Sequence, residues 1–384
     1  MNKSSKKRNN ILYIMGIDWQ WIHQRPQILA EMLAKDYDVM VLYPRSILKI
    51  LRARPQEPGL KMSILWTLPY QEKSRMIGWM SRLINYKTLS SLPGYSCLYV
   101  GYPLYGRYIP DDYKGKIIYD CMDNHDALYP DLKRVHKVIV QERELANRAD
   151  LVIASAQALV DKMNTVMECG VCRLVRNGVE IENCYNIKES AIKETYKVGY
   201  IGTIAGWFDY ELLQESSKYL KKIEYHLIGP GDKSVDSDKI HYEGIVPHDR
   251  LYETIREYDC LIMPFQINDI VKSVDPVKLY EYIAFGKCIV SVWYEEIAQF
   301  EEFVYFYRNA QEYVNLMKSL EREGFPVKYD KKQQSDFLQK NNWKERYKTL
   351  SKWINLMEEN EDENESNECI WNKTGGNKDV SADS

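Results

Sequence analysis

Residues 275–287 read DPVKLYEYIAFGK, and they follow an apolar run at 260–263 that is typical of a buried strand. Pro276 suits the first turn of a helix, where its missing N–H costs nothing, and Gly286 suits the position that ends one. The pattern predicts a helix over 277–285 that begins where a loop leaves the end of a strand. In a doubly wound sheet nucleotides bind at this edge, because a helix N-terminus there presents unpaired N–H groups to phosphate.

Two charged residues of this helix are candidate ligands for a nucleotide. Lys278 could bring a positive charge to a diphosphate, and Glu281, one turn later, could accept hydrogen bonds from ribose hydroxyls. The alternative is that both side chains are solvated and form an ordinary pair three residues apart. Spacing alone leaves both interpretations open.

Strand and helix patterns alternate along the rest of the chain. The apolar run at 11–17 predicts a strand, 27–35 has helical periodicity, and a polar stretch at 182–197 precedes a new strand. Such alternation predicts an α/β protein with two doubly wound, Rossmann-like parallel sheets. We expect four segments: an N-terminal domain over 1–187, a C-terminal domain over 188–342, a helix over 343–357 that packs back toward the first domain, and a disordered acidic tail over 358–384.

Length and cysteine content indicate a two-domain protein of a reducing compartment. The chain has 384 residues and eight scattered cysteines, of which Cys169 and Cys172 form a lone Cys-x-x-Cys pair. Because no two further ligands lie nearby, we expect no metal site. No stretch approaches the roughly 18 apolar residues that span a bilayer, and the apolar run after residues 1–10 is too short for a signal peptide. We therefore expect a cytoplasmic protein.

Positive charge is concentrated in the N-terminal domain, where residues 1–110 hold sixteen Lys and Arg residues against six Asp and Glu residues. Residues 73–87 form a basic amphipathic stretch that could lie on an anionic bilayer. The alternative is a helix that packs its apolar face on the domain core. A second basic group comprises Arg45, Lys49, Arg52 and Arg54. Nucleic acid is disfavoured as a partner, since no recognisable binding module accompanies the charge.

The N-terminal domain also offers polar side chains in loops that follow predicted strands. Asp123 and His125 follow a strand at 116–120, and they could hydrogen-bond a donor sugar or orient an acceptor hydroxyl. Arg25 begins the first helix and could meet a phosphate or an anionic acceptor. Trp21, in the loop before that helix, could stack on a sugar. The alternatives are loop caps for the acid and the histidine, a surface arginine and a core tryptophan.

Residues 264–291 resemble the donor-binding signature of GT-B retaining glycosyltransferases of family 4, particularly the bacterial teichuronic-acid-type group. The likeness extends over most of residues 11–357, with further markers at 21–26, 149–155, 177–179 and 198–203. It implies two Rossmann-like domains that face a cleft and a UDP- or GDP-linked sugar held mainly by the C-terminal domain. It also implies a glycan or lipid-linked glycan as acceptor, and no metal or other cofactor.

The resemblance assigns roles to single residues. It places Glu281 on the ribose. The loop at 202–209 lacks the Arg and Lys that many relatives carry there for the diphosphate, and backbone N–H groups around Gly202 and Thr203 could do part of that work. Many relatives carry a first glutamate eight residues before the second. Here that position is Ser273, and Asp275 is a candidate substitute.

These observations predict a retaining glycosyltransferase for cell-surface polysaccharide, located in the cytoplasm and peripheral at the inner face of the membrane. In the expected reaction the leaving diphosphate helps to deprotonate the acceptor, while Lys278 stabilises its charge. One rival is a nucleotide-sugar epimerase, which would turn over its donor without an acceptor. Another is a glycan- or membrane-binding partner whose catalytic site has decayed, a hypothesis prompted by the missing first glutamate.

Overall fold

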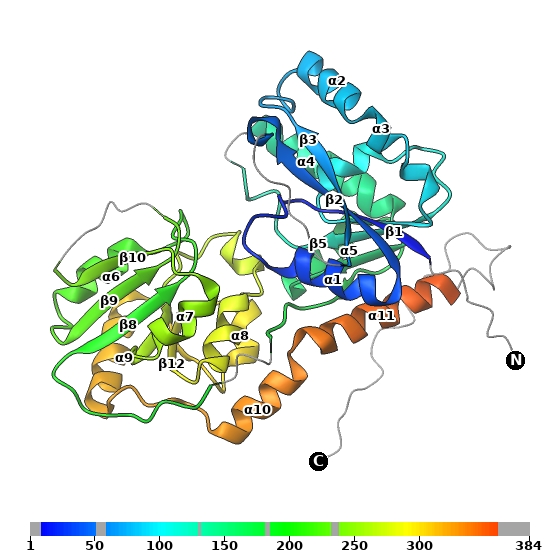
Figure 1. Ribbon diagram of the computed structural model, residues 1–384. Coiled ribbons are helices and arrows are strands. Elements are labelled where there is room, and N and C mark those ends of the chain that lie inside the picture. The colour runs from blue at the N-terminus through cyan, green and yellow to red at the C-terminus, as the bar shows by residue number, and fades with distance from the viewer. Residues whose placement is uncertain (1–8, 51–58, 130–131, 181–184, 232–237, 360–384) are drawn as a thin grey trace, which may run out of the picture. The chain divides into compact units, whose positions relative to one another are not determined.

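The computed structural model describes residues 9–50, 59–129, 132–180, 185–231 and 238–359, and the chain forms two compact units (Figure 1). Unit 1 comprises the residues up to Val175 together with those from Tyr347 onward, and unit 2 comprises Arg176–Arg346. The boundary lies after Val175 rather than at the predicted residue 187. The reason is that the backbone N–H of Asn177 donates a 2.8 Å hydrogen bond to Asp275, which ties this segment to unit 2.

Unit 1 contains one parallel sheet with the strand order β3-β2-β1-β4-β5-β6-β7. Its strands are β1 (Asn10–Ile14), β2 (Asp38–Ser46), β3 (Lys61–Thr67), β4 (Cys97–Val100), β5 (Lys116–Cys121), β6 (Leu151–Ala154) and β7 (Arg173–Leu174). Its helices are α1 (Arg25–Asp36), α2 (Arg75–Ile84), α3 (Tyr86–Leu89), the 3-10 helix η3 (Pro103–Tyr108), α4 (Leu132–Arg148) and α5 (Gln157–Val166). The strand order reverses between β1 and β4, and ligands of doubly wound sheets bind at such a reversal.

Unit 2 contains a second parallel sheet with the order β10-β9-β8-β11-β12-β13. Its strands are β8 (Tyr196–Ile201), β9 (Ile223–Ile228), β10 (Ile240–Gly244), β11 (Cys260–Met263), β12 (Cys288–Val292) and β13 (Tyr305–Tyr307). Its helices are α6 (Tyr210–Ser217), α7 (His248–Ile255), α8 (Val277–Ala284), α9 (Ala310–Glu323) and α10 (Lys331–Lys340). The two sheets confirm the predicted α/β architecture, and the order in unit 2 reverses between β8 and β11.

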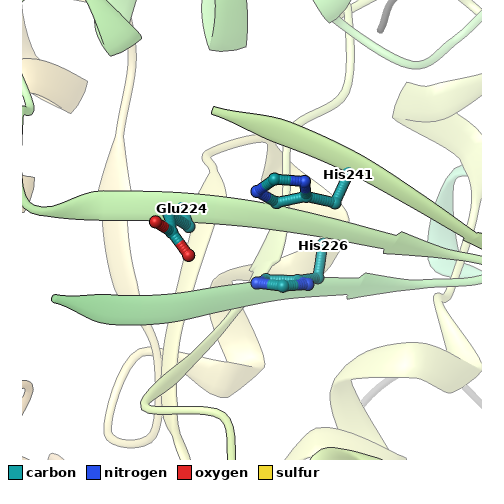
Figure 2. Close-up of side chains that lie close together, drawn as sticks. All are labelled: Glu224, His226 and His241. Atoms are coloured by element: carbon teal, nitrogen blue, oxygen red, sulfur yellow. The ribbon is translucent and has the colours of Figure 1, made fainter. Parts of the chain in front are cut away.

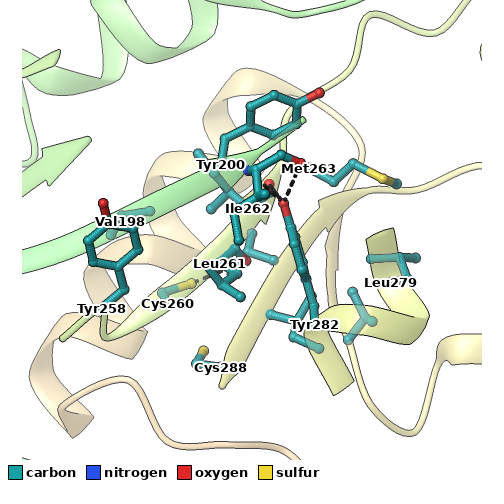
Figure 3. Close-up of a cluster of buried hydrophobic side chains, with 14 of the residues drawn as sticks. Val198, Tyr200, Tyr258, Cys260, Leu261, Ile262, Met263, Leu279, Tyr282 and Cys288 are labelled. Atoms are coloured by element: carbon teal, nitrogen blue, oxygen red, sulfur yellow. Dashed lines mark hydrogen bonds between the residues drawn. The ribbon is translucent and has the colours of Figure 1, made fainter. Parts of the chain in front are cut away.

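Helix α8 confirms the helix predicted over 277–285. Five of its eight residues are buried, and the hydroxyl of Tyr282 accepts a 3.0 Å hydrogen bond from the backbone N–H of Ile201 at the end of β8. Figure 3 shows Leu279 and Tyr282 of α8 among buried side chains of β8 and β11. Pro276 is the N-cap residue rather than a residue of the first turn. Gly286, with φ +64°, follows the helix, and a Cβ there would lie 2.8 Å from a backbone oxygen of Asn186. The buried tyrosine thus ties α8 to the end of β8.

The last helix, α11 (Trp343–Glu359), belongs to unit 1 from Tyr347 onward. The Tyr347 hydroxyl donates a 2.6 Å hydrogen bond to Asp36, and the guanidinium of Arg173 lies 4.5 Å from the centroid of the Trp353 ring. Residues 360–384, most of the predicted acidic tail, lie outside the described residues. Among the helices that the structure describes, none is both long and apolar enough to cross a bilayer.

Candidate functional site

The loops that follow β8 and β11 meet at the point where the strand order of unit 2 reverses. The backbone N–H of Asp209 donates to the carbonyl of Pro264 at 2.8 Å, and that of Gln266 donates to the carbonyl of Trp207 at 2.8 Å. Nucleotides bind in doubly wound sheets at such a reversal, outside the carboxyl ends of the strands. We call this place the donor edge, and define it by Gly202, Thr203, Lys278 and Glu281.

Two glycines make the donor edge compact. Gly202 follows β8 with φ +142°, and Gly229 follows β9 with φ +136°. A Cβ on Gly229 would lie 2.1 Å from the carbonyl oxygen of Gly202, and a Cβ on Gly202 would lie 2.1 Å from Cε of Lys278. Side chains at these positions would therefore clash and would also strain the backbone. The sequence analysis did not single out Gly229, although its signal was available: a glycine directly after a buried strand.

Lys278 lies across Gly202, in the first turn of α8. Its Nζ lies 5.9 Å from the centroid of the Tyr200 ring, and the side chain is half-buried. Burial lowers the pKa of Lys278, and the negative charge of Glu281 only partly opposes this shift. The Lys278 ammonium therefore brings a positive charge to the donor edge, beside Gly202.

The other three residues of the donor edge, Gly202, Thr203 and Glu281, differ in whether their polar groups are already hydrogen-bonded within the protein. The N–H of Gly202 donates to the carbonyl of Ile228 at 2.8 Å, so it is already used within the sheet and is not available to a phosphate as predicted. The carbonyl of Thr203 accepts a 2.8 Å hydrogen bond from the Tyr200 hydroxyl, which fixes this loop. Glu281 is half-buried on α8, and its contact with ribose stays a prediction.

Asp275 is a positioning residue in this structure rather than an exposed ligand. Its side chain is fully buried and accepts hydrogen bonds from the backbone N–H of Asn177 at 2.8 Å, the Tyr280 hydroxyl at 3.0 Å and Nε2 of Gln299 at 3.1 Å. Arg176 lies 3.5 Å away. The carboxylate therefore holds the first residues of unit 2 against the start of α8. This burial argues against Asp275 as a substitute for a sugar-binding glutamate.

Ser273 does not supply the missing group either. It is 5% exposed, and its hydroxyl donates to backbone carbonyls of Asp269 at 3.0 Å and Ile270 at 2.9 Å. Its role is to close the 3-10 turn before α8. The contact that relatives make with a first glutamate has no counterpart at this position.

The pKa of Asp275 leads to a prediction for stability. Burial raises this pKa to about 6, although Arg176 and the hydrogen-bond donors oppose the shift. A carboxyl group with a folded pKa above its unfolded value of about 3.9 stabilises the fold fully below about pH 4, and this contribution is lost as the pH rises through 6. Relative to Asp275→Asn, we expect the wild-type free energy of unfolding to fall by up to about 3 kcal/mol between about pH 4 and pH 7.

Urea denaturation at both pH values measures this difference. Asp269→Asn is the matched control, because Asp269 is an exposed carboxylate in the same loop. A difference between wild type and Asp275→Asn that stays constant with pH would contradict the prediction.

In unit 1, Asp123 and His125 lie in the loop after β5. His125 is 3% exposed, both ring nitrogens are buried without a hydrogen-bond partner among the described residues, and its ring packs edge-on against Tyr102 at 5.5 Å. Burial and the charge of Lys162 lower the pKa of His125, although Asp123 opposes the shift, so the imidazole is neutral at pH 7. Burial raises the pKa of Asp123. A neutral imidazole with uncommitted nitrogens can exchange hydrogen bonds with a hydroxyl.

Arg25 and Trp21 occupy different environments from each other. The Arg25 guanidinium is buried and donates to both carboxylate oxygens of Asp120, at 3.1 and 2.9 Å, and to the carbonyl of Val175 at 2.7 Å. Arg25 therefore faces the interior of unit 1, and this position does not support the predicted contact with phosphate. Trp21 is 58% exposed, whereas Trp19, two residues earlier, is in the core. An exposed tryptophan fits the predicted sugar contact.

A cluster of potential metal ligands lies elsewhere in unit 2. Ligand atoms of Glu224, His226 and His241 come within 4.8 Å of one another on β9 and β10 (Figure 2). His226 pairs in register with Gly199, three residues before Gly202, so the cluster lies away from the carboxyl end of the sheet. Nδ1 of His226 also bonds Glu243 at 2.7 Å. The cluster therefore has no direct contact with the donor edge.

No protein-family model matches the chain. TuaH of Bacillus subtilis strain 168, a glycosyltransferase assigned to teichuronic acid biosynthesis, is 23% identical over 274 residues, or 63% of this chain and 67% of TuaH.

Solved structures share the fold over nearly their whole length. Sucrose-phosphate synthase of Thermosynechococcus elongatus superposes with a TM-score of 0.72 at 13% identity, covering 91% of this chain and 99% of that one. Anabaena HepE, solved in complex with UDP-glucose, gives a TM-score of 0.65 at 14% identity, covering 90% and 99%. The chain therefore has the GT-B fold of two parallel-sheet, Rossmann-like α/β domains, which it shares with these two proteins.

Proposed function

We propose that this chain is a glycosyltransferase that takes its sugar from a nucleotide-sugar donor, most simply a UDP-sugar, held at the donor edge of unit 2. The observation that carries the proposal is the half-buried Lys278 ammonium beside Gly202, at the reversal point of the sheet. Partial burial of the Lys278 ammonium costs free energy, as the lowered pKa of this lysine indicates, and a bound diphosphate would offset that cost. HepE has been solved with UDP-glucose on the same fold, which supports the UDP assignment.

The proposed reaction retains the anomeric configuration and needs no metal ion. The acceptor hydroxyl attacks the anomeric carbon on the face from which the diphosphate leaves, and its proton passes to a diphosphate oxygen as the old glycosidic bond breaks. Lys278 and the N-terminal N–H groups of α8 stabilise the charge on the leaving group. His125, neutral at pH 7, and Asp123 are proposed to position the sugar or the acceptor hydroxyl.

The proposed acceptor is a glycan or a lipid-linked glycan of a cell-surface polysaccharide. The similarity to TuaH, which is assigned to teichuronic acid biosynthesis, supports this choice. We place the enzyme in the cytoplasm, peripheral at the inner face of the membrane, where lipid-linked acceptors lie. The basic residues of the N-terminal domain are consistent with that location.

Calorimetric titration with UDP, GDP and their sugar conjugates in the presence of EDTA tests the proposal. We expect one nucleotide to bind, and Glu281→Ala to weaken its binding by about 10- to 100-fold, because a charge-assisted hydrogen bond contributes roughly 1.5–3 kcal/mol. Glu253→Ala, which removes an exposed glutamate from α7 of the same unit, should bind like wild type.

The same titration, together with an assay for donor turnover, distinguishes the transferase from the decayed binding partner and from the epimerase. If no nucleotide binds with or without EDTA, the enzyme proposal fails and a decayed binding partner remains. Binding that appears only when a divalent cation is supplied would overturn metal independence alone. Conversion of the donor sugar without an acceptor would instead identify an epimerase.

A further inference from the structure

Helix α2 packs on unit 1 with its polar side and exposes its apolar side, the opposite of an ordinary surface helix. Its only fully buried residue is Ser81, whose hydroxyl donates to Oε1 of Gln71 at 2.8 Å. Asn85, four residues later, is also buried, and its side chain bonds both the N–H and the carbonyl of Trp66 on β3 at 2.8 Å. The helix is thus anchored by its polar side on β3, the edge strand of unit 1.

The apolar side of α2 faces outward. Its exposed apolar residues are Met76 (69%), Trp79 (61%), Met80 (44%), Leu83 (53%) and Ile84 (45%). Spacings of three and four residues place these side chains along one face of the helix. The alternative considered for the sequence, in which this face packs on the domain core, is therefore wrong. Soluble surfaces rarely expose such a contiguous patch unless it binds a partner or a membrane.

A cationic cavity of about 300 Å³ opens beside this face. Its lining comes from α2 and the turn before it, from η3 and from α4. The charged lining residues are Lys73, Arg75, Arg82, Arg107, Lys137 and Glu72. Five cations against one carboxylate leave the lining with a net charge of +4. The N-terminus of α2, capped by Ser74, adds its own partial positive charge.

Ion pairs fix the inner wall of the cavity. Glu72 accepts two hydrogen bonds from Arg107, at 2.7 and 2.6 Å, and one from Lys137 at 2.6 Å. Burial alone would raise the pKa of Glu72, but these two cations lower it to about 2. Lys73, Arg75 and Arg82 are exposed at the mouth, and none of the three forms an ion pair with an acid of the described residues. On the inner wall the single carboxylate of Glu72 offsets only one of the two positive charges of Arg107 and Lys137. The three cations at the mouth keep their full positive charge.

We propose that this cavity binds the phosphate group of an anionic phospholipid while the outward face of α2 enters the acyl boundary of the same bilayer. Charge complementarity selects the occupant. The apolar face is bordered by basic side chains on the same helix, the combination that binds interfacial helices to anionic lipid. The inference rests on the peripheral location proposed above, but it requires nothing of the sugar-transfer reaction.

The two described residues of the second basic group, Arg45 and Lys49, are already engaged within unit 1. Arg45 is 1% exposed and donates to Oε1 of Gln20 at 3.0 Å, and Lys49 pairs with Asp18 at 3.3 Å. Arg52 and Arg54 lie outside the described residues. Among the residues that the structure describes, the inferred membrane surface is defined by α2 and the cavity.

Co-sedimentation with vesicles tests this inference. Full-length wild type should bind vesicles that contain phosphatidylglycerol, bind less at high salt, and bind pure phosphatidylcholine vesicles weakly. The double variant R75Q/R82Q should lower the partition coefficient by about 25-fold, fivefold for each cation, the ratio that ~1 kcal/mol represents. Trp79→Ser combined with Leu83→Ser should lower it by more than about tenfold.

Matched controls separate the site from general charge and hydrophobicity. K331Q/K332Q removes two exposed cations from α10 in unit 2, and Ile192→Ser removes a 78% exposed apolar side chain. Both should bind vesicles like wild type. Equal loss in K331Q/K332Q and R75Q/R82Q, or equal binding to both lipid compositions, would overturn the proposal. Calorimetric binding of glycerol phosphate by a wild-type protein that does not bind vesicles would also overturn it, because it would indicate a soluble phosphate ligand.

Thermal melting of each variant checks that it remains folded, which is expected because the substituted side chains are exposed. Nucleotide binding in EDTA should be unchanged in all of them. Loss of vesicle binding with intact nucleotide binding supports the membrane site, and failure of the proposed transferase function would leave the vesicle result unaffected.

Discussion

Replacement of Lys278 by methionine is expected to weaken UDP binding by about 10- to 100-fold without loss of stability. The amine lies over Gly202, where a diphosphate would accept a charge-assisted hydrogen bond of roughly 1.5–3 kcal/mol. In the folded chain without ligand the same amine is partly desolvated, and burial lowers its pKa. Methionine keeps the length of the side chain but removes the charge, so the melting temperature should stay constant or rise.

Calorimetry with UDP and thermal melting without ligand together check this expectation. Lys272→Met is the matched control, since Lys272 is an exposed lysine in the loop before α8, paired with Asp269 at 3.5 Å. A parallel loss of affinity and stability in Lys278→Met would mean that the lysine supports the fold instead of binding an anion. Unchanged affinity would remove the observation on which the proposed function depends.

Substitution of Gly229 by alanine is expected to destabilise the chain by about 3 kcal/mol or more and to abolish nucleotide binding. Two penalties combine: a φ of +136° is strained for alanine, and the new Cβ would lie 2.1 Å from the Gly202 carbonyl oxygen. Since that oxygen belongs to backbone, the strand end must move, and Gly202 moves with it. The donor edge would therefore lose its geometry even where the fold survives.

Two other glycines separate these penalties. Gly244 has φ +75°, but a Cβ added there would meet no atom within 4 Å, so Gly244→Ala should show the strain alone, at about 1 kcal/mol. Gly206 has neither feature, and Gly206→Ala should be neutral or stabilise by up to about 1 kcal/mol. Urea denaturation of the three variants measures the series. An equal effect at Gly229 and Gly244 would show that the close approach to Gly202 is unimportant.

Local patterns in the sequence were sufficient to predict the strand, the loop and the helix that form the donor edge. The apolar run before Gly202 and the Pro–Gly limits of α8 act within a few residues, so the strand, the loop and the helix could be placed from the sequence. The parallel sheets followed from alternation of such elements. These features depend on chain neighbours, which a single sequence displays directly.

Long-range pairings could not be predicted in the same way. Arg25 meets Asp120 across 95 positions, and Asp275 meets Asn177 across 98, so nothing local distinguishes these buried groups from ligand-binding ones. The orientation of α2 was also hidden, because an amphipathic pattern is the same whether its apolar face points in or out. Ser81 and Asn85, polar and four residues apart, were the available signal that the opposite face packs on the sheet.

The burial of Asp275 also decides where unit 2 can be cut from the chain. A fragment that begins at residue 188, where the change in sequence pattern suggests a boundary, would lack Arg176 and Asn177. It would leave a buried carboxylate with two of its partners deleted and the start of α8 without its clamp. A fragment that begins at Arg176 retains those partners. Design of an isolated nucleotide-binding module should therefore follow the contacts of one aspartate rather than the composition of the linker.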